Sequence, residues 1–179
     1  MIYLFLAEGF EEMEALATLD IMRRAGLKAQ LVSVTDNINV TSSHKVTVKA
    51  DILFEDCDFA NCELMILPGG MPGASNLCAH SGLTAQLKEQ NAEQKAIAAI
   101  CAAPYVLGEI GILKGKKATC YPGFEKHLMG AEYTANLVEE DGNIITGKGP
   151  AAACQFGFTI VRRLLGQKVV DELKAGMLF

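Results

Sequence analysis

The sequence predicts an α/β domain in which helices cover both faces of a largely parallel sheet. Short apolar runs alternate with helix-like segments along most of the chain. The runs that end at Leu67 and Ile100 are almost continuously apolar, which is typical of strands buried on both faces. Glycine and proline follow several of these runs. Since ligands of such sheets bind at the carboxyl ends of strands, these loops are the first places to look for a site.

The individual elements follow from local patterns. The predicted strands cover residues 2–7, 28–34, 39–41, 45–49, 63–67, 96–100, 117–120, 137–140 and 143–146. The predicted helices cover residues 11–25, 73–77, 81–93, 105–110, 124–129, 151–165 and 168–174. The segments at 39–49 and 137–146 are expected to be hairpins, and Asp141-Gly142 suits the turn of the second. Ser81 is expected to cap the helix that follows it.

The first helix has the clearest end signals. Acidic residues crowd its first turn, Arg23 and Arg24 occupy its last, and Gly26 follows, in keeping with the helix dipole. Its buried face is expected to carry the apolar residues Met13, Leu16, Ala17 and Ile21.

Composition limits the function classes. The 179 residues suit one domain spanning 1–179, and 50% hydrophobic with 21% charged residues indicates a globular chain. A net charge of -5 argues against nucleic acid or an anionic membrane surface as a general partner. The apolar opening is short and runs into acidic residues, so we expect a first strand, no signal peptide and a cytoplasmic location. Six scattered cysteines and three histidines give no metal-ligand pattern and suggest reduced thiols.

The segment 96–104 is the candidate centre of the protein. Its apolar run ends at Cys101, and Pro104 suits the first turn of a following helix. Cys101 is thus expected in a tight strand-to-helix turn that resembles the nucleophile elbow of hydrolases. That setting favours a thiolate with a pKa below the ordinary value of about 8.5. A buried core cysteine is an equally good interpretation of this stretch alone.

Other candidates lie beside neighbouring strand ends. Glu14 is expected to point inward, where a buried carboxyl has a raised pKa and could hydrogen-bond a thiolate or carry a proton. The N–H groups of Gly69-Gly70 and of Ala102 could stabilise an oxyanion, unless the loop is an ordinary one. Tyr121 could place its hydroxyl over the site, or could simply be a half-buried aromatic residue.

Several motifs together resemble the DJ-1/ThiJ/PfpI superfamily, most closely its DJ-1 and bacterial YajL branch. They are Ala7-Glu8-Gly9-Phe10-Glu11-Glu12-Met13-Glu14, Ile21-Met22-Arg23-Arg24-Ala25-Gly26, Leu67-Pro68-Gly69-Gly70 and Ala99-Ile100-Cys101-Ala102-Ala103-Pro104. The resemblance continues through Gly147-Lys148-Gly149-Pro150 and the final helix.

The resemblance implies a flavodoxin-like three-layer sandwich that forms homodimers. It implies that Cys101 is the nucleophile, that Glu14 is a protonated acid touching it, and that the N–H groups of Gly70 and Ala102 line the oxyanion pocket. Two positions depart from the family pattern. Ala103 replaces a frequent glycine, which is expected to narrow the pocket, and Tyr121 stands where many members have histidine.

The resemblance leaves several activities open. The first is a cysteine-dependent glyoxalase or deglycase that acts on 2-oxoaldehydes or glycated proteins and needs no metal or organic cofactor. The second is a redox-responsive chaperone or sensor that works through oxidation of Cys101. An intracellular peptidase or a thiazole-biosynthesis protein is a weaker alternative, because Tyr121 replaces the imidazole that a Cys-His dyad would use.

Overall fold

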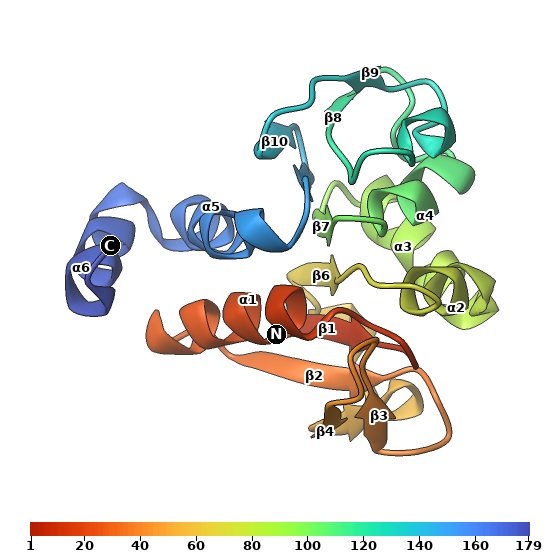
Figure 1. The fold of residues 1–179 in the computed structure, drawn as a ribbon, viewed down its shortest axis with the longest axis horizontal. Helices are drawn as coiled ribbons and strands as arrows, with labels where there is room; N and C mark the ends of the chain where they lie inside the picture. Colours follow the sequence, from red (N-terminus) through yellow and green to blue (C-terminus); the bar gives the residue numbers. More distant parts are fainter.

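A computed structural model describes residues 1–179 and places seven strands in one twisted sheet (Figure 1). The strand order is β10-β11-β7-β6-β1-β2-β5. Every neighbouring pair is parallel except the hairpin β10–β11. The strand bounds are β1 Ile2–Leu6, β2 Ala29–Ser33, β5 Ile52–Leu53, β6 Leu64–Leu67, β7 Ala96–Ile100, β10 Val138–Asp141 and β11 Ile144–Gly147. The predicted fold class is therefore confirmed.

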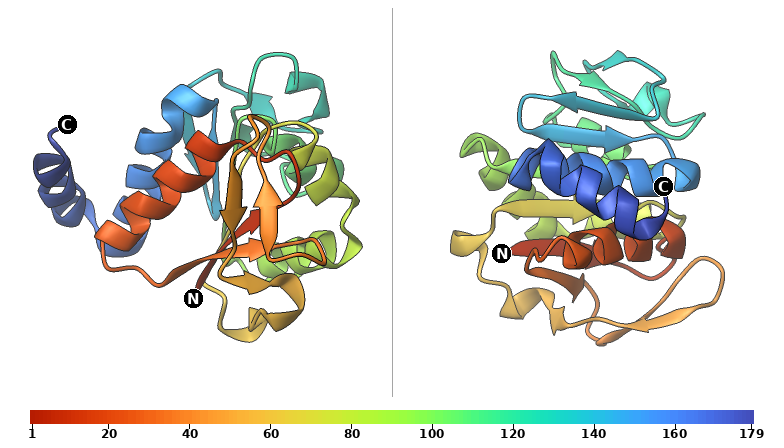
Figure 2. Two further views of the ribbon diagram at one scale, coloured as in Figure 1. Left: turned by 60° about the horizontal axis from the view of Figure 1, so that its bottom comes forward. Right: turned by 90° about the vertical axis from the view of Figure 1, so that its left-hand side faces the viewer.

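Helices form a layer on each side of the sheet (Figures 1 and 2). One layer contains α1 (Glu12–Arg24) and α5 (Ala153–Leu165), which pack against each other, with α6 (Gln167–Met177) outside them. The other layer contains α2 (Gly73–Ala79), α3 (Ser81–Ala92) and α4 (Pro104–Glu109). None of these helices is both long enough and apolar enough to span a membrane.

Short elements complete the chain. Two small sheets lie outside the main one: β3 (Asn39–Thr41) with β4 (Thr47–Lys49), and β8 (Lys117–Ala118) with β9 (Glu132–Tyr133). The 3₁₀ turns are Phe54–Asp56, Phe59–Asn61, Glu125–His127 and Pro150–Ala152.

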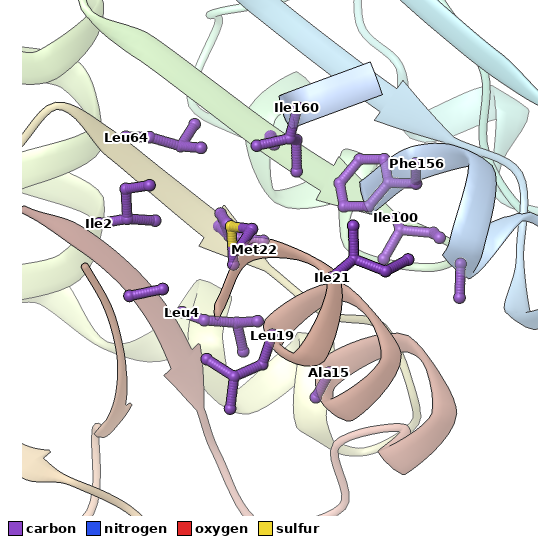
Figure 3. Packing of buried hydrophobic residues seen from close by; sticks show 14 of the residues in the cluster. Ile2, Leu4, Ala15, Leu19, Ile21, Met22, Leu64, Ile100, Phe156 and Ile160 are labelled. Atoms are coloured by element: carbon purple, nitrogen blue, oxygen red, sulfur yellow. The ribbon is translucent and has the colours of Figure 1, made fainter. Parts of the chain in front are cut away.

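Alternating side chains of β1 divide the core between the two layers. Ile2, Leu4 and Leu6 join the cluster under α1 and α5, whereas Tyr3 and Phe5 join the cluster under α2–α4. This is the two-residue period of a strand covered on both faces. Figure 3 shows the α1 side of this core, where side chains of β1, α1 and α5 come together. Each fully buried large apolar side chain contributes about 1.5–3 kcal/mol to folding.

The buried face of α1 differs from the predicted one. Met13 is 58% exposed, and Leu16 and Ala17 are only half-buried. The inward stripe instead runs through Glu14, Ala15, Thr18, Leu19, Ile21 and Met22. The apolar pattern alone predicted the wrong buried face, because the carboxyl of Glu14 and the hydroxyl of Thr18 occupy part of the true one.

Three local predictions were wrong for identifiable reasons. The strand predicted at 117–120 stops at Ala118, because the Thr119 N–H donates to the Thr146 hydroxyl (2.9 Å) instead of continuing a ladder. The cap of α3 is His80, whose Nδ1 accepts the Leu83 N–H at 3.0 Å; Ser81 is the first helical residue. The edge strand β5 was missed because two residues give no periodicity.

Candidate functional site

Three adjacent parallel strands, β1, β6 and β7, end at the same edge of the sheet. The loops that follow them bring Glu14, the Gly69-Gly70 pair and Cys101 together, as the sequence predicted. This edge is where open α/β sheets bind their ligands.

Cys101 lies in a sharp turn between β7 and α4. Its φ is 65°, in the left-handed region that costs a non-glycine residue about 1–2 kcal/mol. Two backbone hydrogen bonds hold this conformation: the Cys101 N–H donates to the Gly147 carbonyl (2.9 Å), and its carbonyl accepts the Tyr121 N–H (2.8 Å). The residue is 8% exposed. A strained and firmly held turn of this kind is typical of a functional position.

Glu14 enters the site from the first turn of α1 and is 1% exposed. Its Oε2 accepts the Gly69 N–H at 2.7 Å. Its Oε1 is buried and has no N–H or hydroxyl partner. The same carboxyl group interacts with the Cys101 thiol. The sequence thus correctly placed Glu14 beside the cysteine.

Burial dominates the titration of this pair. It raises the pKa of Glu14 to about 7; the hydrogen bonds with the Cys101 thiol and the Gly69 N–H oppose this rise, and the charge of Glu11 supports it. Burial also raises the pKa of the Cys101 thiol, and Glu14 raises it further, while the N–H groups of Gly70 and Ala102 oppose the rise.

The predicted low thiol pKa is therefore wrong, because desolvation, and after it the like charge of Glu14, outweigh the backbone donors. When Glu14 is protonated, the repulsion disappears and its O–H can donate to sulfur. The pair is thus suited to sharing a single negative charge.

Glycine is required where the loop meets the pair. A Cβ on Gly69 would lie 2.6 Å from the Cys101 Cβ and 2.7 Å from Glu14 Oε2. Gly70 has a φ of 86°, and a Cβ there would lie 2.5 Å from the Glu11 nitrogen. Gly69 therefore lets the loop approach the thiol and carboxyl closely, and Gly70 lets it pack against the backbone before α1.

Tyr121 lies at the rim of the site. It is 47% exposed, and its ring lies against Gly149. A hollow of about 200 Å³ adjoins it, lined by Tyr121, Pro122, Leu137, Lys148, Gly149, Pro150, Ala151 and Ala152. Tyr121 contacts Cys101 through its backbone N–H, which donates to the Cys101 carbonyl. The residue type alone could not have revealed this hydrogen bond. Ala103 is fully buried in the core cluster under α2–α4, so the structure gives no support to the expected narrowing of the pocket.

The three histidines have other partners. His44 pairs with Glu12 (3.1 Å), His80 caps α3, and His127 pairs with Glu109 (2.9 Å). Glu11, Glu12 and His44 bring ligand-type atoms within 4.8 Å of one another. Hydrogen bonds explain this arrangement, since Glu12 pairs with His44 and Glu11 caps α1.

Comparisons with known proteins identify the family of the chain. The model of the DJ-1/PfpI family matches residues 1–163. The chain belongs to the DJ-1/PfpI family. Its match to the zebrafish (Danio rerio) Parkinson disease protein 7 homolog is 36% identical and covers 97% of this chain and 94% of that protein.

Other DJ-1 proteins are similarly close in sequence or fold. The solved structure of oxidized Toxoplasma gondii DJ-1 superposes with a TM-score of 0.95 at 35% identity, covering 99% of this chain and 97% of that one. Protein DJ-1 homolog B of Arabidopsis thaliana is 38% identical over 94% of this chain, but the match covers only 39% of that longer protein.

Proposed function

We propose that this DJ-1/PfpI protein is a cysteine-dependent enzyme that acts on 2-oxoaldehydes or glycated groups, with a role in carbonyl or oxidative stress. The observation that carries the proposal is the buried Glu14 carboxyl beside Cys101, with a pKa of about 7. An acid with this pKa can both give and take a proton near neutral pH. Cys101 is the proposed nucleophile.

The proposed reaction begins with addition of the Cys101 sulfur to the aldehyde carbon of a 2-oxoaldehyde such as methylglyoxal. A C–S bond forms, and the former carbonyl oxygen takes a proton, giving a hemithioacetal. Glu14 then removes the proton from this carbon and returns one to the neighbouring carbon, through an enediol. The product is a thioester of the 2-hydroxy acid. Water cleaves its C–S bond and regenerates the thiol.

This route is an internal redox reaction, because one carbon of the substrate is oxidised while its neighbour is reduced. It therefore uses no external oxidant, metal or organic cofactor. The N–H groups of Gly70 and Ala102, which act on the Cys101 sulfur, are proposed to stabilise the oxygen anion formed during addition. Tyr121, at the rim, is proposed to line the pocket without transferring a proton. Deglycation of proteins would use the same first adduct.

The test is formation of the 2-hydroxy acid lactate from methylglyoxal by the purified protein, with no glutathione added. Lactate formation that is linear in protein concentration is the expected result. Its absence at millimolar methylglyoxal over the pH range 6–8 would overturn the proposal.

A redox-responsive sensor or chaperone is the second candidate. Successive oxidation of the Cys101 thiolate by two molecules of hydrogen peroxide gives a sulfinate and two molecules of water. The N–H groups of Gly70 and Ala102 and a protonated Glu14 could all donate to the sulfinate oxygens. The oxidized form of the related Toxoplasma protein also favours this candidate.

We also propose that the protein forms a homodimer and resides in the cytoplasm. Met13 on α1 is 58% exposed and Val46 at the β3–β4 hairpin is 45% exposed, which are suitable apolar contacts across a two-fold axis. Light scattering at micromolar concentration is expected to give twice the chain mass of 19.2 kDa. A mass of one chain across that range would contradict the proposed dimer.

A further inference from the structure

A closed ring of three hydrogen bonds joins the start of α1 to the Gly69-Gly70 loop. The Glu11 N–H donates to the Gly69 carbonyl (2.9 Å). The Gly69 N–H donates to Glu14 Oε2 (2.7 Å). The Glu14 N–H donates to Glu11 Oε2 (2.7 Å), which closes the ring. Each residue of the ring is thus fixed by the other two.

Glu11 itself is 7% exposed. As the cap of α1 it stands where serine, threonine, aspartate or asparagine would satisfy the helix with a shorter side chain. A buried carboxylate is more costly than a neutral serine, threonine or asparagine in this place, because it must lose most of its hydration. The bond by which Glu11 caps α1 is also its bond to Glu14, so the same carboxylate acts on a residue of the site.

We propose that Glu11 is a positioning residue for the reaction at Cys101: through this ring its carboxylate holds the Glu14 carboxyl against Gly69 and beside the thiol. The catalytic part of this inference rests on the proposed function, whereas the positioning of Glu14 does not. The negative charge of Glu11 also adds to the effect of burial, which is the main cause that disfavours ionisation of Glu14.

The other charged groups near Glu14 are placed differently. On α1, Glu12 is paired with His44 from the β3–β4 hairpin, and the side chain of His44 is 69% exposed. Before α1, Glu8 is exposed and accepts the Thr41 N–H at 3.2 Å. From the end of β7, the Cys101 thiol is the titratable group that interacts with the Glu14 carboxyl. Glu11 is the acidic side chain that shares a hydrogen-bonded ring with it.

The test compares Glu11→Gln with the matched control Glu12→Gln. A glutamine carbonyl can still accept the Glu14 N–H, so Glu11→Gln removes the charge but retains the cap. The measurement is the pH profile of Cys101 alkylation by iodoacetamide, with the modified peptide quantified by mass spectrometry. Because the charge that favours protonated Glu14 is lost, Glu14 ionises at a lower pH and opposes the thiolate, so the midpoint is expected to rise by about 0.5–1 pH unit. Glu12→Gln is expected to move it by less than half as much.

A Glu11→Gln profile that coincides with that of the wild type would overturn the inference, and so would equal shifts in the two variants. Loss of folding stability alone would not move this midpoint. A shift of the midpoint therefore distinguishes a positioning role of Glu11 from a merely structural one. Alkylation needs no substrate. A shifted midpoint in a protein that makes no lactate would therefore refute the proposed function and still support the positioning of Glu14 by Glu11.

Discussion

Replacement of Cys101 with alanine is expected to lower lactate formation from methylglyoxal by a factor of at least about 10³. Without the sulfur no C–S bond can form, and Glu14 then has no covalent adduct on which to act. Alanine retains a Cβ and meets the same left-handed backbone, so the strain at φ 65° is unchanged and the variant is expected to fold. The measurement is the initial rate of lactate formation at saturating methylglyoxal.

Cys78→Ala is the matched control for this experiment. Cys78 is a half-buried cysteine on α2, outside the pair. It is expected to retain the wild-type rate. Substantial activity in Cys101→Ala, or an equal loss in both variants, would refute the role of Cys101 as the nucleophile.

Replacement of Glu14 with glutamine is expected to remove a large pH dependence of stability. Burial raises the pKa of Glu14 from 4.5 to about 7, so the folded protein binds a proton that the unfolded chain has lost. The stabilisation is fully present below pH 4.5 and is lost as the pH rises through 7. The shift corresponds to about 3 kcal/mol, at 1.36 kcal/mol per unit of pKa.

The measurement is the free energy of unfolding of both proteins by urea between pH 4 and 8. Glutamine can accept the Gly69 N–H and donate to sulfur, so it imitates the protonated acid at every pH. From pH 4 to 8 the wild type is expected to lose about 3 kcal/mol relative to Glu14→Gln, the other titrating groups being common to both. A difference that stays constant with pH would show that Glu14 does not retain its proton in the folded protein.

The sequence was sufficient for the central strands and for placing Glu14 and Cys101 at the same edge of the sheet. Continuous apolar runs that end before a glycine-rich loop or at Cys101 indicate central strands, and the carboxyl ends of such strands are where these sheets bind ligands. The inward direction of Glu14 was predicted correctly, but the prediction assumed that the adjacent Met13 is buried. Met13 is in fact exposed, and the buried face of α1 is partly polar. Hydrophobic periodicity cannot recognise a helix face that buries a carboxyl.

Other features depend on contacts between segments distant in the chain. The ring from Glu11 through Gly69 to Glu14 contains a hydrogen bond between residues 55 positions apart in the chain, so no local sequence pattern predicts it. The hydrogen bonds that fix Cys101 come from Gly147 and Tyr121 in the same way. The thiol pKa was predicted in the wrong direction because local turn chemistry says nothing of how deeply the sulfur is buried or how close an acid lies.

The most direct test of the account is the order in which the six cysteines react with dilute hydrogen peroxide. Burial raises the pKa of Cys57 and Cys120 to about 12 and that of Cys62 to about 11, and it also raises the pKa of Cys101, but no carboxyl is hydrogen-bonded to the first three thiols. Cys78 and Cys154 are half-buried, so peroxide can reach them and they are the main competitors of Cys101 for oxidation. Only Cys101 combines a carboxyl able to donate a proton with two N–H groups acting on its sulfur.

Peptide mass spectrometry after graded peroxide, at pH 6–7 where Glu14 retains much of its proton, measures this order. The account predicts that Cys101 gains oxygen first and stops at the sulfinic acid. Oxidation of Cys78, Cys154 or any other cysteine before Cys101 would contradict the assignment of Cys101 and Glu14 as the reactive pair.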